Sequence, residues 1–143
     1  QPPPAREQLE TLRDEPGIIG EWSTLLLRTA QPPTAITLDL TRLDLADGLS
    51  LLAMNGEISV AYGLFVKERS GGHALPVAYS NGAVGYVVTA VQVAEGGYEA
   101  SEAFRYYGRP GPFTPDVEPR LKEALGALVD EGRPSSPASR GTR

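Results

Sequence analysis

The sequence predicts an α/β fold in which strands alternate with helices around an incomplete sheet. Apolar residues recur at helical spacing in residues 5–30, at every second position in residues 35–41, and at helical spacing again in residues 59–69. A period of 3.6 is typical of a helix with one buried face, and a period of two is typical of a strand. Elements that alternate in this way indicate an α/β domain. A chain of 143 residues is long enough for one such domain with a core.

Residues 1–34 are predicted to be a helical lead segment. Residues 5–15 form a polar helix, and residues 18–30 form a second helix with a broad apolar face. Pro16-Gly17 separates the two helices, and Pro32-Pro33 ends the second one. Proline ends a helix because it cannot donate the hydrogen bond that would continue the ladder.

Residues 35–132 are predicted to form the α/β domain itself. Its first two strands span residues 35–41 and 49–54, with a turn at Asp47-Gly48 between them. Asn55-Gly56 then breaks the chain, because both residue types favour tight turns.

Two helices and one further strand are predicted in the middle of this domain. Residues 59–69 form a helix with an apolar stripe, and residues 75–79 form a short strand. Thr89 and Gln92 have the spacing of a capping box, which predicts a short helix from that point. Residues 98–107 show neither period clearly and are predicted to be irregular.

The last predicted helix begins at Thr114, a residue type that caps helix N-termini, with Pro115 at the first helical position. Gly132 ends this helix. Residues 133–143 contain almost nothing to bury and are predicted to be a disordered tail.

Composition excludes several classes of protein. The net charge of -5 argues against a nucleic-acid partner, since phosphate binding needs clustered Lys and Arg. No stretch approaches the length of about 20 apolar residues that a transmembrane helix needs. The absence of cysteine excludes disulfides and zinc held by thiolates. Because the chain opens at Gln1 without methionine or a signal peptide, we expect that it was trimmed or processed from a longer precursor.

Few residues could form a catalytic centre by themselves. His73 is the only histidine and lies in a glycine-rich loop, so neither a Ser-His-Asp triad nor a zinc site made wholly from this chain is expected. Asp39, Asp44 and Asp47 lack the spacing of a calcium-binding loop and are expected to be solvated strand and turn residues.

Glu57 and a group of tyrosines are the remaining candidates. Glu57 follows a buried strand in a predicted turn, and ligands of open α/β sheets bind at the carboxyl ends of strands. Tyr79, Tyr86 and Tyr98 flank a loop of small residues at 80–85. A turn glutamate is also typical of a solvated surface and a tyrosine of a core or rim, so the residues alone leave both interpretations open.

Three segments in fixed order resemble the neutral/alkaline non-lysosomal ceramidases. They are Gly56-Glu57, the run Asn-Gly-Ala-Val-Gly-Tyr-Val-Val-Thr at residues 81–89, and Tyr-Glu-Ala-Ser at residues 98–101. The similarity covers about residues 35–128. It implies the C-terminal part of a mixed α/β catalytic domain, which would be incomplete without a partner segment. The family consists of zinc amidases that cleave the N-acyl bond of ceramide into sphingosine and a fatty acid, which places it in sphingolipid metabolism.

The resemblance also implies roles for three residues. Glu57 and Tyr86 match two zinc ligands of the family, and Tyr98 matches a catalytic tyrosine that contacts the scissile amide. Two histidine ligands are expected from an N-terminal segment or from a companion chain, so that the two polypeptides form a heterodimer. The implied substrate is a lipid or another amide, and the implied location is secreted or periplasmic.

The sequence departs from the family pattern at several positions. Ala83 stands where the family often has tyrosine, Val88-Thr89 where it has a threonine pair, and Leu64-Phe65 where it has paired arginines. Two alternatives therefore stay open beside a ceramidase. One is a non-catalytic scaffold or binding subunit that keeps the fold. The other is a zinc hydrolase that acts on a different amide or an ester.

Overall fold

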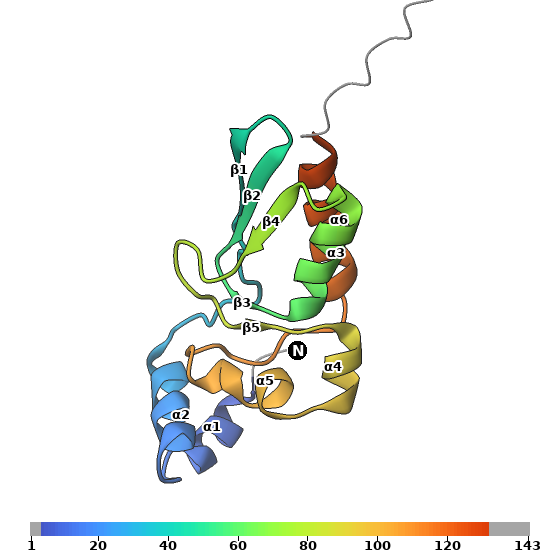
Figure 1. Cartoon of the computed structure of the whole chain (residues 1–143). Coiled ribbons are helices and arrows are strands. Elements are labelled where there is room, and N and C mark those ends of the chain that lie inside the picture. Colours follow the sequence, from blue (N-terminus) through green and yellow to red (C-terminus); the bar gives the residue numbers. More distant parts are fainter. Residues whose placement is uncertain (1–3, 132–143) are drawn as a thin grey trace, which may run out of the picture.

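The computed structural model describes residues 4–131 as a mixed arrangement of helices and strands (Figure 1), which confirms the general α/β class. In chain order, the elements are α1 (Arg6–Leu12), α2 (Ile18–Arg28), β1 (Leu40–Ala46), β2 (Leu49–Met54), β3 (Glu57–Ile58), α3 (Val60–Ser70), β4 (Ala74–Val77), β5 (Tyr86–Val87), α4 (Ala90–Glu95), α5 (Tyr98–Ser101), the 3-10 helix η1 (Ala103–Arg105) and α6 (Val117–Glu131). The predicted tail at residues 133–143 and the predicted helix end at Gly132 lie outside the described residues.

The larger sheet has three strands in the order β1-β2-β4. β1 and β2 are antiparallel and meet at the predicted Asp47-Gly48 turn, where Gly48 has a φ of 74°. β2 and β4 are parallel, and α3 lies in the connection between them. The prediction of a strand at residues 49–54 is confirmed in both its bounds.

The strand predicted at residues 35–41 is wrong in its bounds, because β1 begins only at Leu40. Ile36 and Leu38 do alternate with polar residues, but they line a groove with Phe113 and Val117 near the start of α6. One-sided burial therefore produces a period of two before the chain reaches a strand with which it can pair.

The smaller sheet consists of β3 and β5, which are parallel. Glu57 begins β3 and does not lie in a turn, contrary to the prediction. Its N–H donates to the carbonyl of Gly85 at 2.9 Å, and the N–H of Ser59 donates to the carbonyl of Val87 at 3.1 Å. This second sheet joins residues that are far apart along the chain, so local pattern could not show it.

The predicted capping box of α4 is confirmed. The backbone N–H of Gln92 donates to the Thr89 hydroxyl at 3.3 Å, and the Gln92 side chain accepts from the backbone N–H of Thr89 at 2.9 Å. The last helix starts later than predicted, at Val117, because the N–H of Val117 closes a turn onto the carbonyl of Thr114.

The prediction that residues 98–107 are irregular is wrong, since α5 and η1 lie there. Both are single short turns, in which Ser101 donates to the carbonyl of Gly97 and Tyr106 to that of Ala103. Ala100 and Ala103 are buried, and two small residues at this spacing give too weak an apolar signal for a helix to be predicted.

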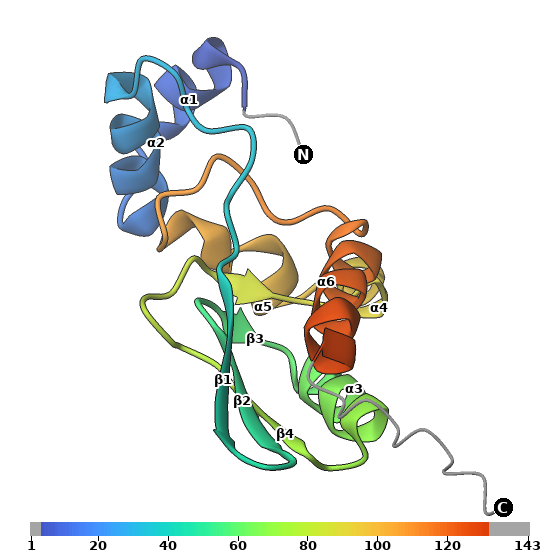
Figure 2. The same cartoon turned by 90° about the horizontal axis from the view of Figure 1, so that it is seen from above.

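The main core lies between the larger sheet and the helices α3 and α6, which lie side by side on one face of that sheet (Figures 1 and 2). β2 alternates as a one-sided strand should, with Ser50, Leu52 and Met54 buried. The buried residues of this main core are Leu52, Met54, Tyr62, Val66, Ala74, Val87, Leu121, Leu125 and Val129.

A smaller core holds α1 and α2 at the end of the molecule opposite the β1–β2 turn. Trp22 packs edge-on against Phe104, with ring centroids 5.6 Å apart, and its indole N–H donates to the carbonyl of Arg109 at 2.7 Å. These contacts attach α2 to η1 and to the residues that follow it. Among residues 4–131, no helix has both the length and the apolar character that a membrane span requires.

Candidate functional site

Glu57 and Tyr86 are direct partners in the β3–β5 pair. Strands in a sheet are about 4.8 Å apart, and residues in register project to the same face. The structure therefore brings these two residues together, although 28 residues separate them in the sequence. Their side chains are half-buried, which leaves the site open to solvent on one side.

Three tyrosines surround the Glu57 carboxylate. Tyr79 and Tyr86 each donate a hydrogen bond to it, and this bond, more than partial burial, raises the pKa of each phenol to about 12. The hydroxyl of Tyr107 lies 3.5 Å from Oε2 of Glu57. The pKa of Tyr107 is also raised, mainly by burial and to a smaller extent by the negative charge of Glu57. A phenol that donates to a carboxylate keeps its proton, so all three are neutral at physiological pH.

Tyr98 lies beside this group, at the start of α5. Its ring meets that of Tyr86 edge-on, with centroids 6.0 Å apart, and the centroid of the Tyr106 ring lies at the same distance from it. Tyr107 approaches Tyr86 in the same manner at 6.2 Å. Because Tyr98 is 46% exposed, it forms part of the rim of the site, where an incoming molecule could touch it.

The turn after β4 directs Tyr79 back toward Glu57. Tyr79 and Asn81 adopt φ values of 56° and 60°. The backbone N–H of Tyr79 donates to the carbonyl of Gly56 at 3.0 Å. Asparagine tolerates this left-handed region, whereas tyrosine adopts it at a cost of about 1–2 kcal/mol. Strain of this kind in a bulky residue is typical of a functional position, since the surrounding contacts must maintain it.

Side chains of α3 and α6 hold the backbone just after β5 through hydrogen bonds. The hydroxyl of Tyr62, a fully buried residue of α3, donates to the carbonyl of Val88 at 2.9 Å. Glu118 of α6 accepts from the N–H of Ala90 at 2.7 Å and from Lys122 at 2.6 Å. These bonds lower the pKa of Glu118, the contribution of Lys122 being the larger.

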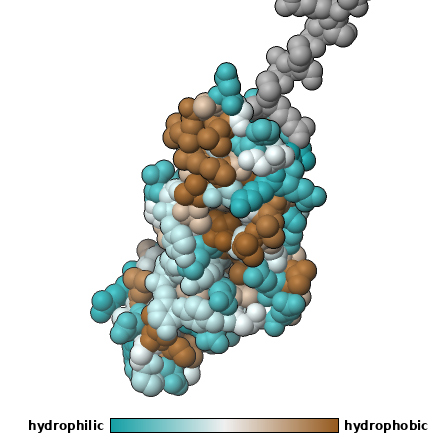
Figure 3. Space-filling view, in the orientation of Figure 1, coloured by the Kyte–Doolittle hydropathy of each residue, from teal (hydrophilic) through white to brown (hydrophobic). Residues whose placement is uncertain are grey.

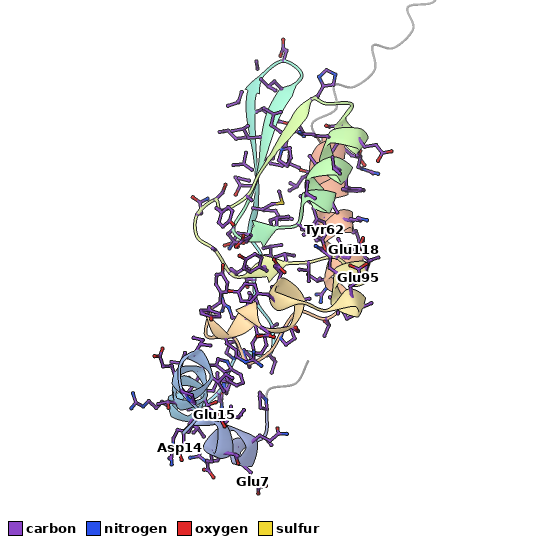
Figure 4. All side chains as sticks on the ribbon, turned by 60° about the horizontal axis from the view of Figure 1, so that its bottom comes forward. Glu7, Asp14, Glu15, Tyr62, Glu95 and Glu118 are labelled. Atoms are coloured by element: carbon purple, nitrogen blue, oxygen red, sulfur yellow. The ribbon has the colours of Figure 1, made fainter. Side chains whose placement is uncertain are left out.

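Figure 4 shows Tyr62 and Glu118 close together in the middle of the molecule. Burial raises the pKa of Tyr62, and the negative charge of Glu118 raises it further. The tyrosine therefore remains a neutral hydrogen-bond donor. Because its acceptor, Val88, is only two residues after Tyr86, this interaction positions the phenol of the site.

Gly85 adopts a backbone conformation that requires glycine. It has a φ of 139°, which a residue with a side chain rarely adopts. Its carbonyl accepts the bond from Glu57 that starts β3. The conformation of Gly85 thus directs its carbonyl toward the first residue of β3.

The other polar residues considered in the sequence have different partners. The Nδ1 atom of His73 is 2.8 Å from the carbonyl of Gly48, at the turn between β1 and β2. Asp39 is bonded to the side chain of Asn55, and Asp44 pairs with Arg42. Within the part of the chain that the structure describes, no three His, Cys, Asp or Glu residues gather as a metal site would require.

The comparisons with known proteins do not assign this chain to a family. No protein-family model matches it, and neither the curated proteins nor the solved structures include a significant match.

The donor set at Glu57 and Tyr86 fits part of a zinc site. A carboxylate and a phenolate are oxygen ligands that zinc accepts together with nitrogen ligands. Two such donors are fewer than the three protein ligands of a typical catalytic site.

Sequence reasoning found Glu57, Tyr79, Tyr86 and Tyr98 but missed Tyr107. The only local signal for Tyr107 is a pair of tyrosines before Gly108, in a segment that was predicted to be irregular. Its contact with Glu57 spans 50 positions of the sequence and depends on where η1 lies.

Proposed function

We propose that this chain is one part of a zinc-dependent amide hydrolase similar to the neutral ceramidases. Glu57 and Tyr86 would be two of its zinc ligands, and the histidine ligands would come from another segment or a companion chain. The observation that carries the proposal is the direct pairing of Glu57 with Tyr86 in neighbouring strands. A zinc site needs several donor atoms that converge on one point, and this pairing brings two of them together.

The residues around the pair have distinct roles in this proposal. Bound zinc would polarise the amide carbonyl and supply hydroxide near neutral pH. Tyr79 and Tyr107 would hold the carboxylate of Glu57 in place through their hydroxyl groups. Tyr98, exposed next to Tyr86, would donate a hydrogen bond to the amide oxygen as it gains negative charge. One such donor contributes about 3 kcal/mol in comparable sites.

The hydrogen bond between Tyr86 and Glu57 has a consequence for metal binding. Tyr86 has a pKa of about 12 because it donates its proton to this carboxylate. If both oxygens become ligands, the phenol must give up that proton, since metal ligands bind in their deprotonated form. Zinc binding to the assembled site should therefore release about one proton from Tyr86.

An apolar groove beside the site favours a substrate with an alkyl chain. It lies between residues 33–40 and the start of α6 and has a volume of about 340 Å³. Its lining residue Phe113 lies within 3.8 Å of the position that a Cβ at Gly85 would occupy, so the groove approaches the loop in front of Tyr86. A lipid amide fits this combination better than a small polar amide does. Secretion or a periplasmic location follows from the resemblance and is part of this proposal.

The test uses the chain together with the polypeptide that supplies the histidines. We expect about one zinc per complex and hydrolysis of an N-acyl amide with a long alkyl chain. Glu57→Gln should lower zinc affinity and activity by at least about 100-fold, because it removes a charged ligand. Tyr106→Phe is the matched control, since Tyr106 is 61% exposed and does not touch Glu57, and it should change neither.

Two results would refute the proposal. One is an active complex without metal. The other is a Glu57→Gln variant that keeps its zinc, which would favour the non-catalytic scaffold.

A further inference from the structure

The chain contains two asparagines, and each is followed by a glycine. Asn55-Gly56 joins β2 to β3, and Asn81-Gly82 lies in the loop between β4 and β5. In such a pair the backbone nitrogen of the glycine can attack the asparagine side chain, because glycine has no side chain to hinder it. The local sequence therefore gives both pairs the same reactivity, and the fold decides which of them reacts.

The fold restrains Asn55 at both polar atoms of its side chain. Its Oδ1 accepts from the backbone N–H of Asp39 at 2.7 Å, and its Nδ2 donates to the Asp39 carboxylate at 3.0 Å. The residue is 5% exposed, and a Cβ at Gly56 would lie 3.1 Å from Ile58 and 3.2 Å from Val87. The Asn55 side chain cannot turn toward the nitrogen of Gly56 without breaking both bonds in a tightly packed place.

Asn81 and Gly82 have none of these restraints. Both are exposed, and a Cβ at Gly82 would meet no atom within 4 Å. Among residues 4–131, no hydrogen bond involves the Asn81 side chain or the backbone N–H of Gly82. Their loop projects from the side of the molecule in Figure 1, and Figure 3 shows pale to hydrophilic surface over that side. Water therefore reaches this pair, and the asparagine side chain is free to turn.

The reaction at such a pair consumes water and releases ammonia. The deprotonated backbone nitrogen of Gly82 attacks the side-chain amide carbon of Asn81, and the amide nitrogen leaves as ammonia. The product is a cyclic succinimide, which water opens at either of its carbonyl carbons. Opening at the side-chain carbonyl gives aspartate, and opening at the main-chain carbonyl gives isoaspartate, in which the backbone runs through the side chain. Both products carry a negative charge that asparagine lacks.

Isoaspartate alters the turn that holds Tyr79 against Glu57. The N–H groups of Ser80 and Val84 donate to the carbonyls of the last residue of β2 and of the residue after it, at 3.0 Å and 2.8 Å, so both ends of the loop are fixed. Isoaspartate adds a carbon atom to the backbone between these fixed points. Tyr79 keeps its φ of 56° only through its surroundings, so a longer turn allows it to relax and to leave the carboxylate.

We infer that Asn81 is a site of spontaneous deamidation, and that its conversion to isoaspartate releases Tyr79 from Glu57. Asn55, which has the same following residue in the sequence, is protected by the fold. The reaction requires neither zinc nor a companion chain, so the inference stands apart from the proposed function.

Peptide mapping by mass spectrometry tests the site. The full chain is incubated at mildly alkaline pH, folded or in urea, and each deamidation raises the mass of its peptide by about 1 Da. In the folded chain, Asn81 should react at least about tenfold faster than Asn55, which must wait for local opening. In urea the two rates should agree within about threefold, since the fold no longer distinguishes them. Equal rates in the folded chain, or an unreactive Asn81, would overturn the inference.

Nitration of tyrosine tests the consequence for the candidate site. Tetranitromethane reacts with the phenolate, and a pKa of about 12 instead of 10 leaves Tyr79 with about 100-fold less phenolate near neutral pH. In chains that carry isoaspartate at position 81, nitration of Tyr79 should be at least about tenfold faster than in the unmodified chain. Tyr106, which is 61% exposed and does not touch Glu57, should react at the same rate in both.

The variant Asn81→Asp separates backbone length from charge. It carries the added carboxylate on a backbone of normal length, and aspartate tolerates the same left-handed conformation as asparagine. Its Tyr79 should therefore be nitrated at the slow rate of the unmodified chain. Fast nitration of Tyr79 in Asn81→Asp, or slow nitration in the isoaspartyl chain, would contradict the release of Tyr79 through a longer turn.

Discussion

Removal of the Tyr62 hydroxyl group tests whether α3 supports the backbone of the site. Tyr62 is fully buried, and its hydroxyl donates to the carbonyl of Val88, which is itself 4% exposed. The substitution Tyr62→Phe keeps the ring and removes only this donor. The carbonyl of Val88 then loses the hydrogen bond from Tyr62, and because Val88 is buried, water replaces that bond poorly.

The expected cost follows from these contacts. Leaving a buried acceptor unpaired costs about 1–3 kcal/mol. The larger cost of about 3–5 kcal/mol for truncating an aromatic residue does not apply, because the ring remains and creates no large cavity. With a urea dependence of about 2 kcal/mol per M, a loss of about 2 kcal/mol lowers the unfolding midpoint by about 1 M.

Urea unfolding of three proteins measures this effect. Tyr106→Phe is the control, because Tyr106 is 61% exposed, and its midpoint should correspond to a change within about 0.5 kcal/mol. If Tyr62→Phe unfolds at the same midpoint and with the same slope as the control, the hydroxyl of Tyr62 does not support β5 and the reasoning is wrong.

Two further predictions concern titration and close packing. Unfolded tyrosine titrates near pH 10, whereas Tyr79 and Tyr86 titrate at about 12. Between these values the folded chain binds more protons than the unfolded chain, so stability should fall as pH rises from 10 to 12. Urea midpoints across this range should show the fall, and Glu57→Gln should reduce it; an equal fall in the variant would contradict the assignment. In α2, a Cβ at Gly20 would lie 2.1 Å from the carbonyl oxygen of Glu15, so Gly20→Ala should destabilise the fold by at least about 2 kcal/mol in thermal unfolding. Gly63→Ala in α3, where the nearest atom is 3.4 Å away on Pro76, should be neutral or stabilising by up to about 1 kcal/mol, and similar values for both would refute the argument.

Local signals in the sequence predicted the elements that depend on neighbouring residues. The second helix, β2, α3 and the capping box at Thr89 all have patterns that lie within a few positions. The start of β1 was wrong because Ile36 and Leu38 show the period of a strand while they pack near α6. A pattern of burial shows which side of the chain is covered, and it does not show whether a partner strand is present.

The site depended on long-range contacts that no local pattern contains. Glu57 and Tyr86 were paired in the prediction only through the family resemblance, and the structure places them in register. Tyr107 joins them because η1 and the following turn lead the chain back toward β3, which requires the packing of Ala100 and Ala103. Only the three-dimensional arrangement shows that a single carboxylate has three phenol neighbours.

The bond from Trp22 to Arg109 links the first helices to the tyrosines. Arg109 receives the indole N–H at its carbonyl and uses its own Nε to donate to the carbonyl of Val84 at 3.1 Å. Two hydrogen bonds of Arg109 therefore connect Trp22 of α2 to Val84, the residue before Gly85. Substitutions in α2 that shift the indole should alter the aromatic surroundings of Tyr86. Through these bonds, α2 stabilises the position of the loop that precedes Tyr86.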